Sequence, residues 1–123
     1  MAYLYIGDQK VSPILMRDYQ VVTISGAVPV INLANYTIYN TEESALTSLT
    51  IVNPSPIPTD FVAQINFTSG ATATVLNSTN IDWFGDNVSD TQGPILRENC
   101  NYAIVFYYTG SKLRGIIQGS SIS

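Results

Sequence analysis

Hydrophobic residues recur at every second position in several short runs of this chain, which is the pattern of β-strands that bury one face. In residues 61–68, one face carries only apolar side chains: Phe61, Ala63, Ile65 and Phe67. In residues 101–109, the same period brings four large side chains together: Tyr102, Ile104, Phe106 and Tyr108. Both runs are therefore predicted strands whose apolar faces lie in the core.

Residues that favour turns, mainly Gly, Pro, Asn, Asp and Ser, separate these runs and divide the chain into many short strands. Further strands are predicted at residues 20–25, 35–39, 45–52, 71–76, 81–84 and 112–118. No segment has a convincing helical pattern, since the best candidate, residues 42–49, is short and rich in Thr and Ser. The small, polar tail at residues 119–123 is expected to fray.

The first residues predict a β-hairpin. Residues 3–6 form its first arm, residues 7–10 its turn and residues 11–15 the returning arm. Pro13 interrupts the returning arm, and because proline has no N–H to donate to a ladder, this arm is predicted to be an edge strand. We therefore interpret residues 1–16 as an N-terminal hairpin and a candidate docking element.

Roughly nine or ten short strands without a helix predict an all-β fold. The expected architecture is an antiparallel, jelly-roll-like β-sandwich formed by residues 17–123 as a single domain, preceded by the hairpin of residues 1–16. A length of 123 residues suits one domain. The strand order stays open, because many Greek-key topologies fit the same set of strands.

Charged residues are scarce, and this changes how the surface is interpreted. They make up 11% of the chain, against about 25% in an average soluble domain, while 46% of the residues are hydrophobic. Either part of the surface is buried in an assembly, or the protein has an exposed surface rich in Thr and Asn. The net charge is −4 and no basic stripe is present, so nucleic acid is not an expected partner.

Several function classes are excluded by what the chain lacks. It has no histidine, which is the commonest general base and a frequent metal ligand. Glu42 and Glu43 are adjacent and would point apart on a strand, so they predict no carboxylate pair for glycoside hydrolysis. No apolar run is long enough to span a bilayer, and the first residues lack the pattern of a signal peptide. We therefore expect no enzyme, no cofactor and no membrane partner.

Cys100 is the only cysteine, so no disulfide can form within the chain. It is expected to be either a small buried hydrophobe or an unreactive thiol in a loop. A lone thiol is compatible with synthesis in a reducing compartment.

One segment contains the residues of a candidate ligand site. Asp82, Asp86 and Asp90 are spaced four apart, and carboxylates in a loop can hold Ca²⁺, although this spacing does not match an EF-hand. The alternative is a solvated loop without a metal. Trp83 beside these residues could stack on a sugar ring, with the aspartates binding its hydroxyls; the alternative is a Trp that packs in the core.

The order of several segments resembles a β-domain found in virion proteins of tailed bacteriophages. The matching segments are Asn35–Thr37, Leu46–Ile51, Phe67–Gly70, Ile81–Gly85 and Glu98–Ile104. They follow the recurring forms of a tSLTI strand, an F-x-T/S-G strand end, an I-x-W-x-G segment and an N-x-x-Y-x-I final hairpin. The opening Ile6–Val11 is similar to the short IGxxKV hairpins of phage tail and head accessory proteins. The resemblance covers roughly residues 1–15 and 35–118, and residues 17–33 have no counterpart in it.

This resemblance implies a non-enzymatic structural or adsorption role on the virion: a head fibre, a capsid decoration, or a tail or baseplate accessory protein. It implies assembly with itself, commonly as a homotrimer, contacts with other virion proteins, and synthesis in the cytoplasm of the bacterial host. It carries over no catalytic residue. The alternative function is a carbohydrate-binding module that recognises cell-surface glycans, with Asp82, Trp83, Asp86 and Asp90 as its candidate ligand residues.

Overall fold

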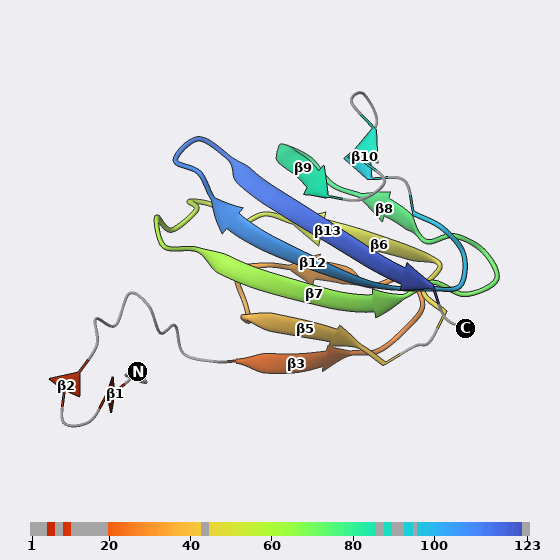
Figure 1. Cartoon of the computed structure of the whole chain (residues 1–123), viewed down its shortest axis with the longest axis horizontal. Helices are drawn as coiled ribbons and strands as arrows, with labels where there is room; N and C mark the ends of the chain where they lie inside the picture. The colour runs from red at the N-terminus through yellow and green to blue at the C-terminus, as the bar shows by residue number, and fades with distance from the viewer. Residues whose placement is uncertain are drawn as a thin grey trace.

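The computed structural model describes residues 5–6, 9–10, 20–42, 45–85, 88–89, 93–94 and 96–121. Every regular element in these ranges is a strand, so the prediction of an all-β fold is confirmed. The strands form one six-stranded sheet, one three-stranded sheet and two ladders of two strands each (Figure 1).

The larger sheet has the order β3 (Val21–Ile24), β5 (Ile38–Thr41), β7 (Val62–Thr68), β12 (Cys100–Tyr108), β13 (Leu113–Ser121), β9 (Ile81–Gly85). The smaller sheet has the order β4 (Val30–Asn32), β6 (Ser48–Val52), β8 (Val75–Asn77). The two ladders pair β1 (Tyr5–Ile6) with β2 (Gln9–Lys10) and β10 (Val88–Ser89) with β11 (Gly93–Pro94).

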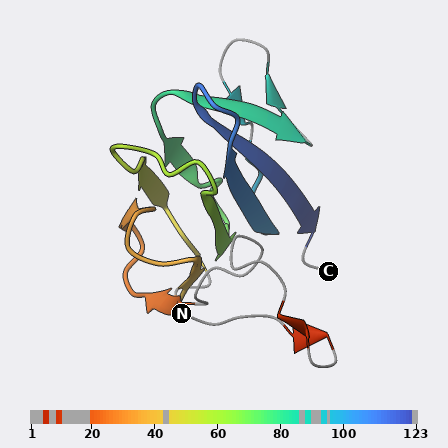
Figure 2. The same cartoon turned by 90° about the vertical axis from the view of Figure 1, so that its left-hand side faces the viewer.

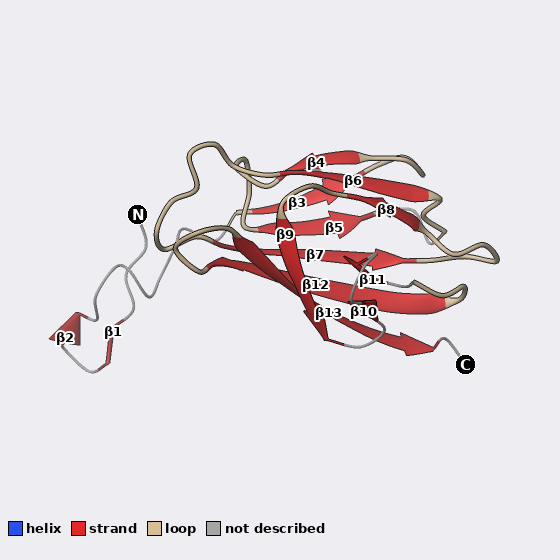
Figure 3. Cartoon of the chain, turned by 90° about the horizontal axis from the view of Figure 1, so that it is seen from above, coloured by secondary structure: helices blue, strands red, loops and turns tan. Residues whose placement is uncertain are grey.

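From β3 to β8 the chain passes back and forth between the two sheets. Strands β3, β5 and β7 are parallel neighbours in the larger sheet, and β4, β6 and β8 are parallel neighbours in the smaller one. Figure 2 looks along the strands, and Figure 3 shows the smaller sheet beside the β3–β5–β7 part of the larger. The chain therefore winds in successive coils, and each coil adds one strand to each sheet.

The expectation of antiparallel pairing is wrong for these coils and for β9, which lies parallel to β13. It holds for β7, β12 and β13, which are antiparallel neighbours. Alternating hydrophobicity shows which face of a strand is buried, but it carries no information on the direction of the neighbouring strand. Parallel neighbours need a crossover between them, and in the coils a strand of the other sheet lies in each crossover.

One apolar core is shared by both sheets. The smaller sheet contributes side chains such as Ile31 and Leu49, which are almost fully buried, and the larger sheet contributes Ile65 and Ile104. The predicted inward faces of residues 61–68 and 101–109 are confirmed by their burial. Cys100 is also buried, as expected for a small hydrophobe.

Other differences from the sequence prediction lie at the ends of elements. Strand β4 lies outside the predicted strand ranges. Strand β13 extends to Ser121, which pairs with Cys100, so the expected fraying is wrong for residues 119–121. Pairing holds Gly119 and Ser120 in the sheet although both are exposed.

The N-terminal hairpin is present, but its turn is tighter than expected. Tyr5 pairs with Lys10 and Ile6 with Gln9, so residues 9–10, which were assigned to the turn, form the second strand. The expected returning arm at residues 11–15 lies outside the described residues. Figures 1 and 3 show the β1–β2 ladder apart from the two sheets. The division into residues 1–16 and 17–123, and the docking role of the hairpin, stay predictions.

Candidate functional site

Trp83 points into the protein. Its ring meets Phe106 edge to face, with the ring centroids 5.9 Å apart. On β13 it covers Gly115, where an added Cβ would lie 2.6 Å from Cζ3 of the indole. Gly115 is thus the residue that leaves room for this ring. Of the two interpretations of Trp83, the structure supports packing against the core, with the ring partly buried.

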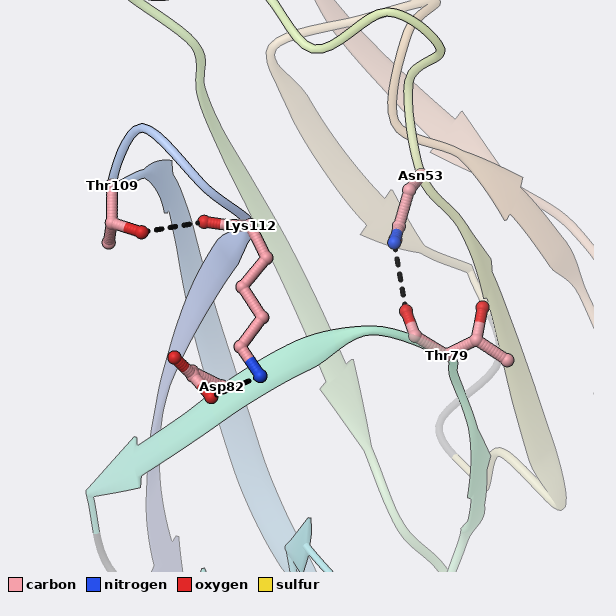
Figure 4. Close-up of polar contacts among 5 residues, drawn as sticks. All are labelled: Asn53, Thr79, Asp82, Thr109 and Lys112. Carbon is pink, nitrogen blue, oxygen red and sulfur yellow. Dashed lines mark hydrogen bonds and ion pairs between the residues drawn. The ribbon is translucent and has the colours of Figure 1, made fainter.

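Asp82 lies on the opposite face of β9 and is engaged with a lysine. Its Oδ1 is 2.9 Å from Nζ of Lys112, and both side chains are partly exposed. Lys112 in turn is held in the β12–β13 turn, where its carbonyl accepts a hydrogen bond of 2.9 Å from Oγ1 of Thr109 (Figure 4). Asp82 and Trp83 therefore do not converge on one ligand.

Asp86 and Asp90 lie outside the described residues, so the calcium site stays a prediction. In the part of the chain that the structure describes, no three His, Cys, Asp or Glu side chains gather as metal ligands would. The same ranges contain no helix that is long and apolar enough to cross a membrane.

Arg114 is a second cation beside β9, in register with Asp82. Its guanidinium carbon lies 4.1 Å from the centroid of the Phe84 ring, and its Nη1 donates a 3.1 Å hydrogen bond to the hydroxyl of Tyr107. Cation–π contacts of this kind favour a fixed guanidinium. The two cations at this end of the outer face are thus in contact with neighbours, Lys112 with Asp82 and Arg114 with Phe84 and Tyr107.

A different part of the larger sheet contains a shallow cavity of about 540 Å³. We call it the amide groove and define it by six lining residues: Asn40, Asn66, Thr68, Asn101, Gln118 and Ser120. They come from four neighbouring strands, β5, β7, β12 and β13, and they alternate with side chains that point into the core. None of the described residues that line the cavity carries a charge.

The register of the sheet explains why these side chains meet. Asn66 pairs with Asn40 on one side and with Ala103 on the other, and Ala103 pairs with Gln118. These four positions form one row across the sheet, and the small methyl group of Ala103 leaves its middle low. Thr68, Asn101 and Ser120 form the next row in the same way: Asn101 pairs with both neighbours.

Hydrogen bonds orient the amides of the groove. Nε2 of Gln64 donates to Oδ1 of Asn66 at 2.8 Å, and Nδ2 of Asn66 donates to Oδ1 of Asn40 at 2.9 Å. In the next row, Oγ1 of Thr68 donates to Oδ1 of Asn101 at 2.7 Å. A primary amide has two donor hydrogens and an oxygen with two lone pairs. Each group thus has a capacity for more hydrogen bonds than these contacts use.

Sequence reasoning missed this groove. The alternation in residues 61–68 does place Gln64, Asn66 and Thr68 outward, but a single outward polar face is ordinary for a strand. The informative feature is that Asn40, Asn101 and Gln118 stand beside them, and this depends on the order and register of four strands.

Two of the segments that carry the phage resemblance meet beside the groove. The backbone N–H of Ser69 donates to the carbonyl of Cys100 at 2.9 Å, and the N–H of Cys100 donates to Oγ of Ser69 at 3.1 Å. The N–H of Asn99 reaches the carbonyl of Gly70 at 2.8 Å. These motif residues fasten the end of β7 to the start of β12, which is a structural role.

Comparison of this chain with family models, with curated proteins and with solved structures gave no match.

Proposed function

We propose that this protein is a non-enzymatic structural component of a bacteriophage virion that assembles with copies of itself. The virion location rests on the sequence resemblance, which leaves a head fibre, a capsid decoration and a tail or baseplate accessory protein as equivalent choices. Self-assembly, with a homotrimer as the expected form, is supported by one feature of the fold, the open end of the coils at β3 and β4.

The first coil, which contains β3 and β4, leaves an open edge in both sheets of the described part of the chain. In the described part of the chain, β3 and β4 each have a neighbour on one side only, so alternate backbone N–H and C=O groups point away from the sheet. Neither strand contains a charged residue, and Pro29 is the sole proline next to them. Val21, Val28 and Val30, which belong to this coil, are 55%, 64% and 66% exposed.

Such an edge is a template for a further strand. Monomeric proteins usually protect edges with charged side chains, prolines or bulges, because free backbone groups pair readily with another chain. Burial of the three valines against a second subunit would remove apolar surface from water. The low content of charged residues also supports self-assembly, because few charges leave little electrostatic repulsion between copies.

We further propose that the two sheets are the layers of a β-sandwich. This is supported by the core, since buried side chains of both sheets, such as Leu49 and Ile65, belong to one cluster. The jelly-roll form is not part of the proposal, because jelly rolls are built from antiparallel strands and the coils have parallel neighbours.

Light scattering on a sizing column tests the self-assembly. We expect the wild-type protein to have a mass that is a multiple of 13.4 kDa, with three subunits as the expected number. The double variant Val21→Lys/Thr23→Lys puts two charges on the open edge and should elute as a folded monomer. Its matched control, Val75→Lys/Asn77→Lys on the outward side of β8, should keep the wild-type mass. A wild-type protein that is monomeric at high micromolar concentration would contradict the proposal.

The second candidate function is attachment to a cell-surface glycan. Two residues of the predicted site have other contacts, since Trp83 packs against Phe106 and Asp82 pairs with Lys112, and Asp86 and Asp90 stay predictions. Its specific support is the amide groove, whose uncharged lining of amides and hydroxyls suits the chemistry of a sugar. Both functions are compatible in one virion protein that is fixed to the particle at one surface and contacts the host with another.

A further inference from the structure

We infer that the amide groove binds a neutral saccharide and recognises it by amide hydrogen bonds without an exposed aromatic platform. The inference rests on the second candidate function and deepens it, because it names the site and the class of ligand. It does not depend on self-assembly, since the groove lies on the outward face of β5, β7, β12 and β13 and all its lining residues come from one chain.

The chemistry of the lining selects hydroxyl groups. A sugar hydroxyl donates one hydrogen bond and accepts others, and a primary amide does the same through its nitrogen and its oxygen. Asn66, Asn101 and Gln118 present such amides within one cavity, and Thr68 and Ser120 add hydroxyls. The hydrogen bonds from Gln64 to Asn66 and from Asn66 to Asn40 hold the amides in place before a ligand arrives. Because these side chains are already ordered, binding costs less conformational entropy.

The absence of charge in the described lining makes the ligand neutral. An anionic saccharide, such as a uronate or a phosphorylated polymer, would lose hydration in the groove without meeting a cation. Lys112 and Arg114 belong to the opposite end of β13 from Gln118 and Ser120, where Lys112 pairs with Asp82 and Arg114 lies over the Phe84 ring. Neutral hexoses and N-acetylhexosamines carry no such penalty.

Size and shape favour a short linear saccharide over a monosaccharide. The cavity of about 540 Å³ falls within the range of about 300–1,000 Å³ that is usual for small-molecule sites. It crosses four strands at the low point formed by Ala103, so the ligand lies across the sheet and contacts Asn40 and Gln118 at opposite sides.

The strands that carry the groove pack against the core on their inner face. The side chains of Phe67 and Tyr102 are buried on the inner face of the same strands, and their rings stack with centroids 5.3 Å apart. Both residues are among those that line the cavity, but they are only 3% and 5% exposed, so their rings offer little surface to a ligand. Because no ring stacks on the sugar, affinity for a single site should be low, and repeated copies on a particle would raise it through avidity.

Nuclear magnetic resonance of the ¹⁵N-labelled protein tests the inference at the level of single side chains. The probes are neutral linear hexasaccharides of glucose, mannose, galactose and N-acetylglucosamine, with hexagalacturonate as the anionic comparison. We expect at least one neutral probe to shift the side-chain NH₂ signals of Asn66, Asn101 and Gln118. The NH₂ signals of Asn53 and Asn77, which lie outside the groove, should stay in place.

The double variant Asn101→Ala/Gln118→Ala removes two exposed amides and should weaken binding at least about fivefold, because it removes hydrogen bonds that both amides would make to a sugar. The matched control Thr50→Ala/Asn77→Ala, on the outward face of the smaller sheet, should bind like the wild type. Light scattering on all samples gives their oligomeric state, so a loss of saccharide binding can be distinguished from a loss of self-assembly. The inference is overturned if no neutral probe shifts the groove signals at about 10 mM, if the shifts map elsewhere, or if hexagalacturonate binds as tightly.

Discussion

At the scale of the residue, neighbours in the sequence separate as soon as they enter a strand. Asp82 and Trp83 were grouped as one ligand site, but side chains alternate along β9, so one lies outside beside Lys112 and the other inside against Phe106. The period of two was sufficient to predict that they point apart. It was not sufficient to predict which of them faces the core.

Tyr102 provides a prediction at the same scale. Burial raises the pKa of its phenol above the usual value of about 10, and a hydrogen bond of 2.7 Å from the N–H of Arg97 to the hydroxyl acts in the opposite direction. The folded state therefore holds this proton more tightly than the unfolded chain. The stabilising contribution is complete below about pH 10 and is lost as the pH rises through the raised pKa of the folded state.

Urea unfolding between pH 7 and pH 11.5 measures this effect. We expect the free energy of unfolding of the wild type to fall above about pH 10, and that of Tyr102→Phe to fall less steeply. At pH 7 the variant should be less stable by about 1 kcal/mol, because the N–H of Arg97 loses its acceptor. Parallel curves for the two proteins above pH 10 would show that Tyr102 does not couple folding to pH.

At the scale of the element, β12 is the strand on which most of the larger sheet depends. It pairs along its whole length with β13 and along most of its length with β7. Its inward side chains lie in the core, and its outward ones form the floor of the amide groove and the surface next to it. One strand thus supports both the core and the candidate site.

Two adjacent substitutions separate these roles. Ile104 is fully buried and Val105 is 37% exposed on the other face. Ile104→Ala should lower the free energy of unfolding by about 2–5 kcal/mol, because it removes transfer energy and leaves a cavity. Val105→Ala should cost less than about 1 kcal/mol. Equal losses for the two variants in urea unfolding would contradict the inward and outward assignment of β12.

At the scale of the whole molecule, the two sheets are expected to unfold together because they share one core. Trp83 is the only tryptophan and lies on β9, at the edge of the larger sheet opposite to β3. Its fluorescence reports on that edge, whereas far-ultraviolet circular dichroism reports on all strands. We predict that both signals change with the same midpoint in urea.

A variant in the first coil makes this test sharper. Val22 on β3 packs against the core from the far edge. Val22→Ala should shift the fluorescence and dichroism midpoints by the same amount if the sheets unfold as one unit. A dichroism change that precedes the fluorescence change would show that the β3–β4 coil unfolds by itself, as end units of repeat proteins can.

Much of the fold could be predicted from sequence where the signal is local. The inward faces of β7 and β12 and the burial of Cys100 follow from alternation and composition, which act within a few residues. The amide groove could not be predicted in this way. Asn40, Asn66, Asn101 and Gln118 come from four strands, and their contact depends on register between distant segments.

The sequence by itself determined that the chain forms strands, which side of each long strand is apolar, and that few charges cover the surface. Only the tertiary structure decided that the coils are parallel and that β9 joins β13. The coils do not produce a regular repeat in the sequence, because paired positions on neighbouring strands are unequally spaced. Val21 pairs with Ile38, and Ile38 pairs with Gln64 much farther along the chain. Burial pattern is a property of one strand and its own residues, whereas direction and neighbour are settled by which set of strands closes a common core.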